Sequence, residues 1–139
     1  MQSSPFSSDQ TDILRSIVDR IIPEDDYPGA WKAGVGSYIE RLIADREELV
    51  QQYELGLTAC NEEAVAAHGH SLLELSESDR DTVLARIESG SVLTEWIFDP
   101  AEFFRMVVRH TMEGFYADPG NGGNLDGVAW KMVGFEVTA

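Results

Sequence analysis

Three histidines are the side chains of this sequence best suited to metal binding or proton transfer. His68 and His70 stand two positions apart, a spacing at which two imidazoles can bind one metal ion from a strand or a loop. No third histidine, cysteine or close acidic residue follows at a familiar ligand spacing, so we interpret Gly69 as a helix C-cap. Histidine titrates near neutral pH, which makes His110 the best single candidate for proton transfer. The sequence implies no carboxylate or nucleophile beside it, which favours a structural or interfacial position.

The acidic run from Glu24 to Asp26 is a second place to look for chemistry. Adjacent carboxylates attract a cation, but a calcium site needs further oxygen ligands at defined offsets, so we predict a solvated connection. The sequence also lacks the glycine-rich dinucleotide fingerprint, the phosphate loop and the nucleophile elbow. One alternative stays open, a stand-alone small enzyme or metal- or sugar-binding protein that uses His68, His70 or His110 with the acidic run.

Glycine, asparagine, aspartate and proline fill every position from Asp118 to Asn124. Pro119 fixes its own φ and moves the preceding residue out of the helical region, so a helix must end near Ala117. Adjacent glycines let another backbone or a ligand approach closely, and the asparagines offer short hydrogen-bonding groups. Two interpretations compete, a helix C-cap with a turn into a short last helix, and a shaped loop that contacts a partner.

Amphipathic helices account for most of the remaining chain. Apolar residues recur at helical spacing after a cap at Ser7, Ser8 or Thr11, and Pro23 ends this first helix. Similar patterns predict helices over residues 35–45 and 47–67, a helix from a cap at Ser76 or Ser78 to residue 88, and helices over residues 100–116 and 126–133.

No strand pattern, internal repeat or low-complexity tract is present in the sequence. The predicted fold class is therefore all-α, an irregular bundle of five or six helices with a glycine-rich loop before a short C-terminal helix. We assign residues 1–10 to a flexible N-terminal segment and residues 11–139 to a single helical domain. Gly56 indicates a close helix crossing or a kink, and Gly114 lies on an apolar stripe where a missing side chain admits a neighbouring helix.

The charge balance excludes several classes of partner. Ten Lys and Arg against 25 Asp and Glu give a net charge of −15, which repels phosphate backbones, so we predict no nucleic-acid partner. No apolar run approaches the ~20 residues of a membrane helix, so no direct membrane span is expected.

Cys60 is the only cysteine and is expected in the core. Residues 1–10 lack the features of a signal peptide, which predicts a cytoplasmic protein, or a periplasmic one if a signal was removed or export occurs with a partner.

Several separated blocks of the sequence occur in an order that is typical of one protein family. They are Arg20-Ile-Ile-Pro-Glu-Asp25, Pro28-Gly-Ala-x-x-Ala-Gly-Val35 with Tyr38-Ile39, Thr111-Met-Glu-Gly-Phe-Tyr-Ala-Asp-Pro119, Gly122-Gly-Asn124 and Trp130-Lys-Met-Val-Gly-Phe135. Through these blocks, from about Leu14 to Phe135, the chain resembles the gluconate 2-dehydrogenase subunit 3 family, the small subunits of bacterial flavin-dependent sugar and polyol dehydrogenases.

The resemblance implies a non-catalytic accessory subunit that binds and stabilises a large FAD-dependent dehydrogenase of the glucose-methanol-choline type. It implies no cofactor in this chain, because the large subunit binds FAD and oxidises the sugar. It also implies a further partner, a cytochrome or another electron acceptor. Family members often carry a twin-arginine signal that exports the folded large subunit, and they are linked to its maturation. This sequence differs from that pattern, since no such signal precedes its first helix.

An accessory subunit needs a docking surface, and interface energy concentrates in Trp, Tyr and Arg side chains. We predict that the partner interface comprises the glycine-rich loop with nearby aromatic and basic residues, namely Tyr116, Asp118, Asn121, Gly122, Gly123, Asn124, Trp130 and Lys131. Weaker candidates are Arg20, Trp31 and Arg109. The alternative for Trp130 is a place in the core, and the alternative for Asp118 is a cap on the last helix.

Overall fold

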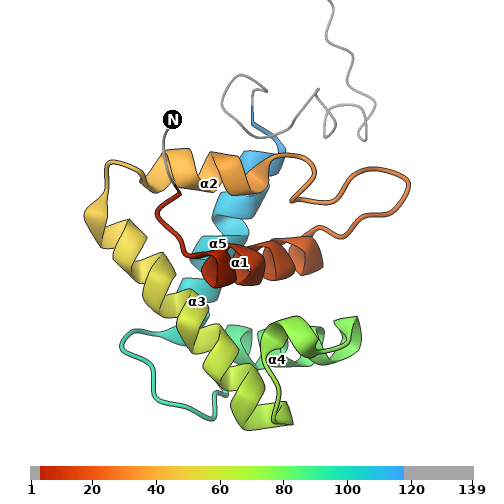
Figure 1. The fold of residues 1–139 in the computed structure, drawn as a ribbon, viewed down its shortest axis with the longest axis vertical. Helices are drawn as coiled ribbons and strands as arrows, with labels where there is room; N and C mark the ends of the chain where they lie inside the picture. The colour runs from red at the N-terminus through yellow and green to blue at the C-terminus, as the bar shows by residue number, and fades with distance from the viewer. Residues whose placement is uncertain (1–3, 118–139) are drawn as a thin grey trace, which may run out of the picture.

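The structure, a computed structural model, describes residues 4–117 of the chain. These residues form helices with no strand among them (Figure 1). The elements are α1 (Ser8–Ile21), α2 (Val35–Ile43), α3 (Glu47–His68), the 3₁₀ helix η1 (Leu72–Glu74), α4 (Glu77–Ser89) and α5 (Pro100–Phe115). The predicted all-α fold is confirmed. The glycine-rich loop and the helix expected over residues 126–133 lie outside the described residues.

Three of the five α-helices in the described part of the chain, α1, α4 and α5, start with side-chain caps that are local in the sequence. The Oγ of Ser7 accepts a hydrogen bond from the backbone N–H of Gln10 at 3.1 Å, and the Gln10 side chain accepts one from the N–H of Ser7 at 2.9 Å. This reciprocal pair is a complete capping box. Ser76 caps α4 through the N–H of Asp79 at 3.1 Å, and the side chain of Asp99 caps α5. Of the caps left open by the sequence, Ser7 and Ser76 are the ones used.

The N-terminal residues contribute to the core as well as to the first cap. Phe6 is only 7% exposed, and its ring lies 6.0 Å from that of Tyr53 in α3, measured between centroids. Because Ser7 supplies the cap, α1 begins at Ser8, ahead of the domain boundary predicted at residue 11. Cys60 is buried among apolar side chains, as predicted for a small core residue.

Helices α1 and α5 form the centre of the bundle. Each contacts all of the other α-helices, as α3 also does, and Figure 1 shows α5 passing behind α1, with α2 and α4 at opposite ends. The buried apolar side chains of all these helices belong to one cluster, so the packing encloses a single core. None of the helices within residues 4–117 has the length and apolar character that crossing a membrane requires.

Two helical glycines mark close contacts between helices. A Cβ atom at Gly56 would overlap the ring of Phe103, so α3 and α5 approach each other at this position. A Cβ atom at Gly114 would lie 2.8 Å from Cδ1 of Tyr38 in α2, well inside the preferred separation of two carbons. The prediction that Gly114 admits a neighbouring helix is confirmed. For Gly56, the structure shows the predicted close helix crossing.

Candidate functional site

The end of α5 is where the predicted partner interface enters the described part of the chain. Tyr116 follows the helix with 45% of its surface exposed, while its neighbour Phe115 is buried. The two rings meet edge to face with 5.2 Å between centroids, so a core residue supports the exposed one. The other predicted interface residues all lie outside the described residues, namely Asp118, Asn121, Gly122, Gly123, Asn124, Trp130 and Lys131.

Close contacts between α2 and α5 lie just before Tyr116 in the chain. Tyr38 packs on Gly114, and its Oη donates a hydrogen bond to Oε2 of Glu113 at 3.4 Å. Burial raises the pKa of Tyr38, and the charge of Glu113 acts in the same direction, so the phenol stays protonated and remains a donor. Met112 is 44% exposed and stands one helical turn before Tyr116. The end of α5 therefore carries an apolar and aromatic surface on a rigid helix crossing.

His110 lies in the core, away from any reactive surface. It is 6% exposed, and its Nδ1 lies 2.8 Å from Oη of Tyr53. The two rings stack with 5.8 Å between centroids. Burial lowers the pKa of His110 and raises the pKa of Tyr53, so at neutral pH the hydrogen bond joins a neutral phenol to a neutral imidazole. Of the structural and interfacial positions that the sequence favoured for His110, the structure shows the buried, structural one.

His68 and His70 lie on either side of the C-terminal end of α3. Gly69 ends that helix with φ of 76°, as predicted for a C-cap. His70 Nδ1 is 3.2 Å from Oε2 of Glu74 in an exposed pair. Within residues 4–117, no three His, Cys, Asp or Glu side chains are grouped so that they could hold a metal ion. The geometry of this part of the chain therefore gives no support to a metal site built on the two histidines.

The acidic run lies on the exposed connection between α1 and α2. Glu24, Asp25 and Asp26 are all exposed, and Oε1 of Glu24 lies 2.6 Å from Nζ of Lys32. The carboxylate of Asp25 accepts a hydrogen bond from the backbone N–H of Tyr27 at 3.0 Å, which closes a local turn. The predicted solvated connection is confirmed.

Two of the weaker interface candidates are used inside the molecule. Arg20 donates from Nε and Nη2 to the two carboxylate oxygens of Asp81 at 2.8 and 3.0 Å, a forked ion pair that joins α1 to α4. Trp31 donates its backbone N–H to Asp19 at 2.9 Å and packs against the core. Arg109 is exposed on α5.

A charged groove of about 690 Å³ lies between α1 and the segment that contains η1 and the start of α4. Arg15, Arg20 and Arg80 line it together with four carboxylates. Arg80 donates to the carbonyl oxygens of Leu72 and Leu73 at 3.0 and 2.8 Å, which fixes η1 against α4. Two of the three arginines that line the groove, Arg20 and Arg80, therefore hold neighbouring elements together.

Glu63 is a buried charged residue that was not predicted from the sequence. It is 1% exposed, and its carboxylate accepts hydrogen bonds from the backbone N–H groups of Leu93 at 3.0 Å and Thr94 at 2.8 Å. The hydroxyl of Thr94 and, at 3.3 Å, Nε1 of Trp96 also donate to it. Burial would raise the pKa of Glu63, but the hydrogen bonds outweigh it and the pKa is lowered. An ionised carboxylate therefore anchors the connection between α4 and α5.

The sequence contains a signal for this anchor. Glu63 stands between Cys60 and Ala64 on the stripe of α3 that faces the core, where a carboxylate has to find donors to be tolerated. The donors named above all belong to a loop some 30 positions away, as the separations of 30 to 33 residues show. The sequence shows a carboxylate at a core-facing position of the helix, but it does not show which loop supplies the hydrogen-bond donors.

Side chains of the α4–α5 loop, residues 90–99, alternate between the core and solvent. Those that pack against the core are Val92, Trp96 and Phe98. Those that face solvent include Leu93, Glu95 and Ile97. The rings of Trp96 and Phe98 lie 6.1 and 5.7 Å from that of Phe103, so aromatic contacts secure the inner side of the loop. The outer side exposes Leu93 by 55% and Ile97 by 83%.

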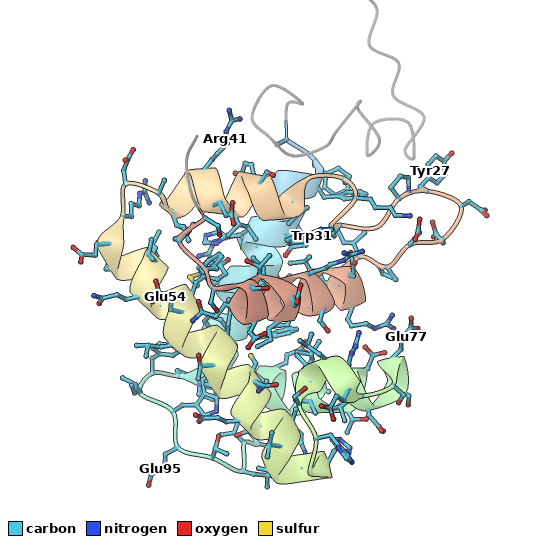
Figure 2. The ribbon with its side chains drawn as sticks, in the orientation of Figure 1. Tyr27, Trp31, Arg41, Glu54, Glu77 and Glu95 are labelled. Carbon is cyan, nitrogen blue, oxygen red and sulfur yellow. The ribbon has the colours of Figure 1, made fainter. Side chains whose placement is uncertain are left out.

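An apolar groove of about 160 Å³, called the α3–loop groove below, lies between α3 and this loop. Its lining residues are Leu55, Thr58, Ala59 and Glu62 from α3, and Glu95, Trp96, Ile97 and Phe98 from the loop. Both charged residues of the lining are carboxylates. Figure 2 shows Glu95 pointing outward from the loop, at the opposite side of the view from Tyr27.

Comparison with protein families gives one match that covers nearly the whole chain. The model of the family described as gluconate 2-dehydrogenase subunit 3 matches residues 8–136. No curated protein and no solved structure matches the chain.

Proposed function

The chain belongs to the gluconate 2-dehydrogenase subunit 3 family, and from this premise we propose that it is a non-catalytic accessory subunit of a flavin-dependent dehydrogenase. In this proposal it binds and stabilises a large FAD-dependent subunit of the glucose-methanol-choline type, which oxidises a sugar or polyol. The observation that carries the proposal is the family match over residues 8–136. FAD belongs to the large subunit, and a cytochrome or another acceptor receives the electrons.

The described side chains support a binding role through what they contact. Several polar side chains that could do chemistry are engaged in holding the fold, namely the Tyr53–His110 and Arg20–Asp81 pairs and the anchoring carboxylate of Glu63. Large apolar side chains, by contrast, are exposed at the end of α5 and on the α4–α5 loop. Exposed apolar and aromatic groups on a rigid base are the usual anchors of protein interfaces.

We place one part of the interface at the end of α5. Tyr116 is the residue of this surface that lies within residues 4–117. We propose that the surface also includes residues that follow along the chain, namely Asp118, Asn121, Gly122, Gly123, Asn124, Trp130 and Lys131. An aromatic anchor beside a glycine-rich loop allows close approach of a partner backbone. This surface is supported by the exposure of Tyr116 and Met112.

Co-expression tests the proposal. The large flavoprotein subunit is produced alone, with the full-length chain, and with an unrelated small helical protein of similar charge as the control. Soluble yield, FAD bound per polypeptide and sugar-dependent dye reduction are measured for each preparation. We expect all three to rise only with this chain, because a bound subunit stabilises the folded, FAD-loaded state by mass action. Equal yield, FAD content and activity in all three preparations would contradict the proposal.

A further inference from the structure

We propose that the α3–loop groove is a preformed docking site for a segment of the large flavoprotein subunit in which an apolar side chain is flanked by lysine or arginine. This inference rests on the proposed function, because it concerns the same partner. It adds a second contact area to the one at the end of α5. A stable interface buries roughly 800 Å² on each partner, which favours more than one such area.

Apolar groups define what the groove can hold. Trp96 and Phe98 line it and are partly buried against the core. Leu55 and Ile97, exposed by 46% and 83%, line it as well. A single apolar side chain inserted there would contact aromatic and aliphatic surface and would cover Ile97. Such a central apolar anchor within a polar rim is the typical arrangement of a protein interface.

Glu63 fixes the loop that forms one wall of the groove. Burial of a carboxylate is costly unless hydrogen bonds compensate it, and here Leu93, Thr94 and Trp96 of the loop supply the donors. The loop backbone is therefore held in position in the free chain, with Leu93 and Ile97 directed outward. A surface that is already ordered loses little conformational entropy when a partner binds. This pre-organisation is what distinguishes the loop from an ordinary connection.

Charge selects the occupant. The charged lining residues, Glu62 and Glu95, are both negative, and the whole chain carries a net charge of −15. A second copy of the chain would bring the same carboxylates and the same net charge, which disfavours self-association through this groove. Anionic lipid surfaces are repelled for the same reason. A protein segment with basic residues beside its apolar anchor is attracted, and its association is accelerated by the field.

The test measures binding of the full-length chain to the immobilised, FAD-loaded large subunit at low and high salt. Ile97→Asp should weaken the affinity by at least about tenfold, because it places a charge in the apolar contact. Glu62→Lys combined with Glu95→Lys should slow association several-fold at low salt, and the difference should largely vanish near 1 M salt, where charges are screened. Tyr27→Asp is the matched control, since it adds a charge at another exposed residue, and it should leave binding within about twofold.

The outcomes separate this inference from the proposed function. Unchanged binding of both groove variants, beside tight binding of the wild-type chain, would overturn the groove and leave the accessory role intact. Absence of wild-type binding would overturn both. Light scattering that shows a dimer which Ile97→Asp dissociates would assign the groove to a second copy and overturn the inference. Ile97 is 83% exposed, so its variant should keep the wild-type urea midpoint, and the charge-reversed pair gives a second readout if it does not.

Discussion

Buried polar residues join parts of the chain that are far apart in sequence. Glu63 of α3 holds the α4–α5 loop, and Tyr53 of α3 pairs with His110 of α5, 57 positions away. The sequence favoured a structural or interfacial place for His110 but did not identify Tyr53 as its partner, because the pairing depends on how two helices cross. Glu63 was missed for a related reason, since most of its donors belong to a loop without a periodic pattern. Each group would be costly if it were left unpaired.

Replacement of Glu63 by glutamine should lower the free energy of unfolding at pH 7 by about 1.5–3 kcal/mol, the range for hydrogen bonds to a charged group. The pKa of Glu63 is lowered in the folded state, so its stabilising contribution is present above the unfolded-state value of about 4.3 and is lost as pH falls through the folded-state pKa. The difference between wild type and Glu63→Gln should therefore shrink on acidification. Urea unfolding at stepwise pH measures it.

The exposed neighbour supplies the control for this measurement. Glu62→Gln makes the same carboxylate-to-amide change at the exposed neighbouring position, and it should alter the free energy of unfolding by less than about 0.5 kcal/mol. A Glu63→Gln penalty that stays constant down to the acid transition would show that the ionised carboxylate is not its source.

The lowered pKa of His110 predicts a second pH range in which the stability of the protein changes. Its pKa is lowered in the folded protein, so below the unfolded-state value of about 6.5 the unfolded chain takes up a proton more readily. The wild-type chain should therefore lose stability relative to His110→Gln as pH falls from 7 towards 5. The comparison uses urea midpoints of both proteins across that range. Parallel curves for the two proteins would mean that His110 titrates in the folded state as it does in the unfolded chain.

At the scale of elements, local signals account for most of what was predicted. Every helix expected within residues 4–117 is present, because caps and apolar spacing are written over a few adjacent residues. The 3₁₀ helix η1 was not predicted, since a single short turn has no periodicity to detect. The helix bounds predicted a connection between residues 88 and 100, but not the conformation of the α4–α5 loop. From Val92 to Phe98 apolar residues face both the core and solvent, so hydropathy alone cannot assign its sides.

The crossing of α3 and α5 predicts the effect of filling a helical glycine. Gly56→Ala gains up to about 1 kcal/mol of helix propensity, but the added methyl group overlaps Phe103, and overpacking of this kind costs about 1–3 kcal/mol. The net result should be a less stable protein, measured as a lower urea midpoint. Gln51→Ala on the exposed side of α3 is the control and should be neutral or slightly stabilising. Equal stabilisation by both substitutions would contradict the close crossing.

At the scale of the whole molecule, the proposed role of the bundle is to position binding surfaces. Helices α1, α3 and α5 each contact every other α-helix, and the two surfaces proposed for the partner lie at the end of α5 and beside α3. The family and its fold class could be predicted from the sequence, because the blocks that carry the resemblance are spread along nearly the whole chain. The α3–loop groove could not be predicted from the sequence, because it forms only where α3 packs against a loop that Glu63 holds in place. Of the eight main residues of the interface predicted from sequence, Tyr116 alone falls within the described range, beside the weaker candidates Arg20, Trp31 and Arg109.

Direct binding to the large subunit tests the central claim most closely. The purified full-length chain is mixed with the FAD-loaded large subunit, and the mixture is separated by size with light scattering and flavin absorbance recorded together. The account predicts that the chain moves into the flavin-absorbing peak and raises its mass by 15.4 kDa for each copy bound. Elution of the chain alone at every concentration tested, beside a large subunit that stays folded and FAD-loaded without it, would contradict the account.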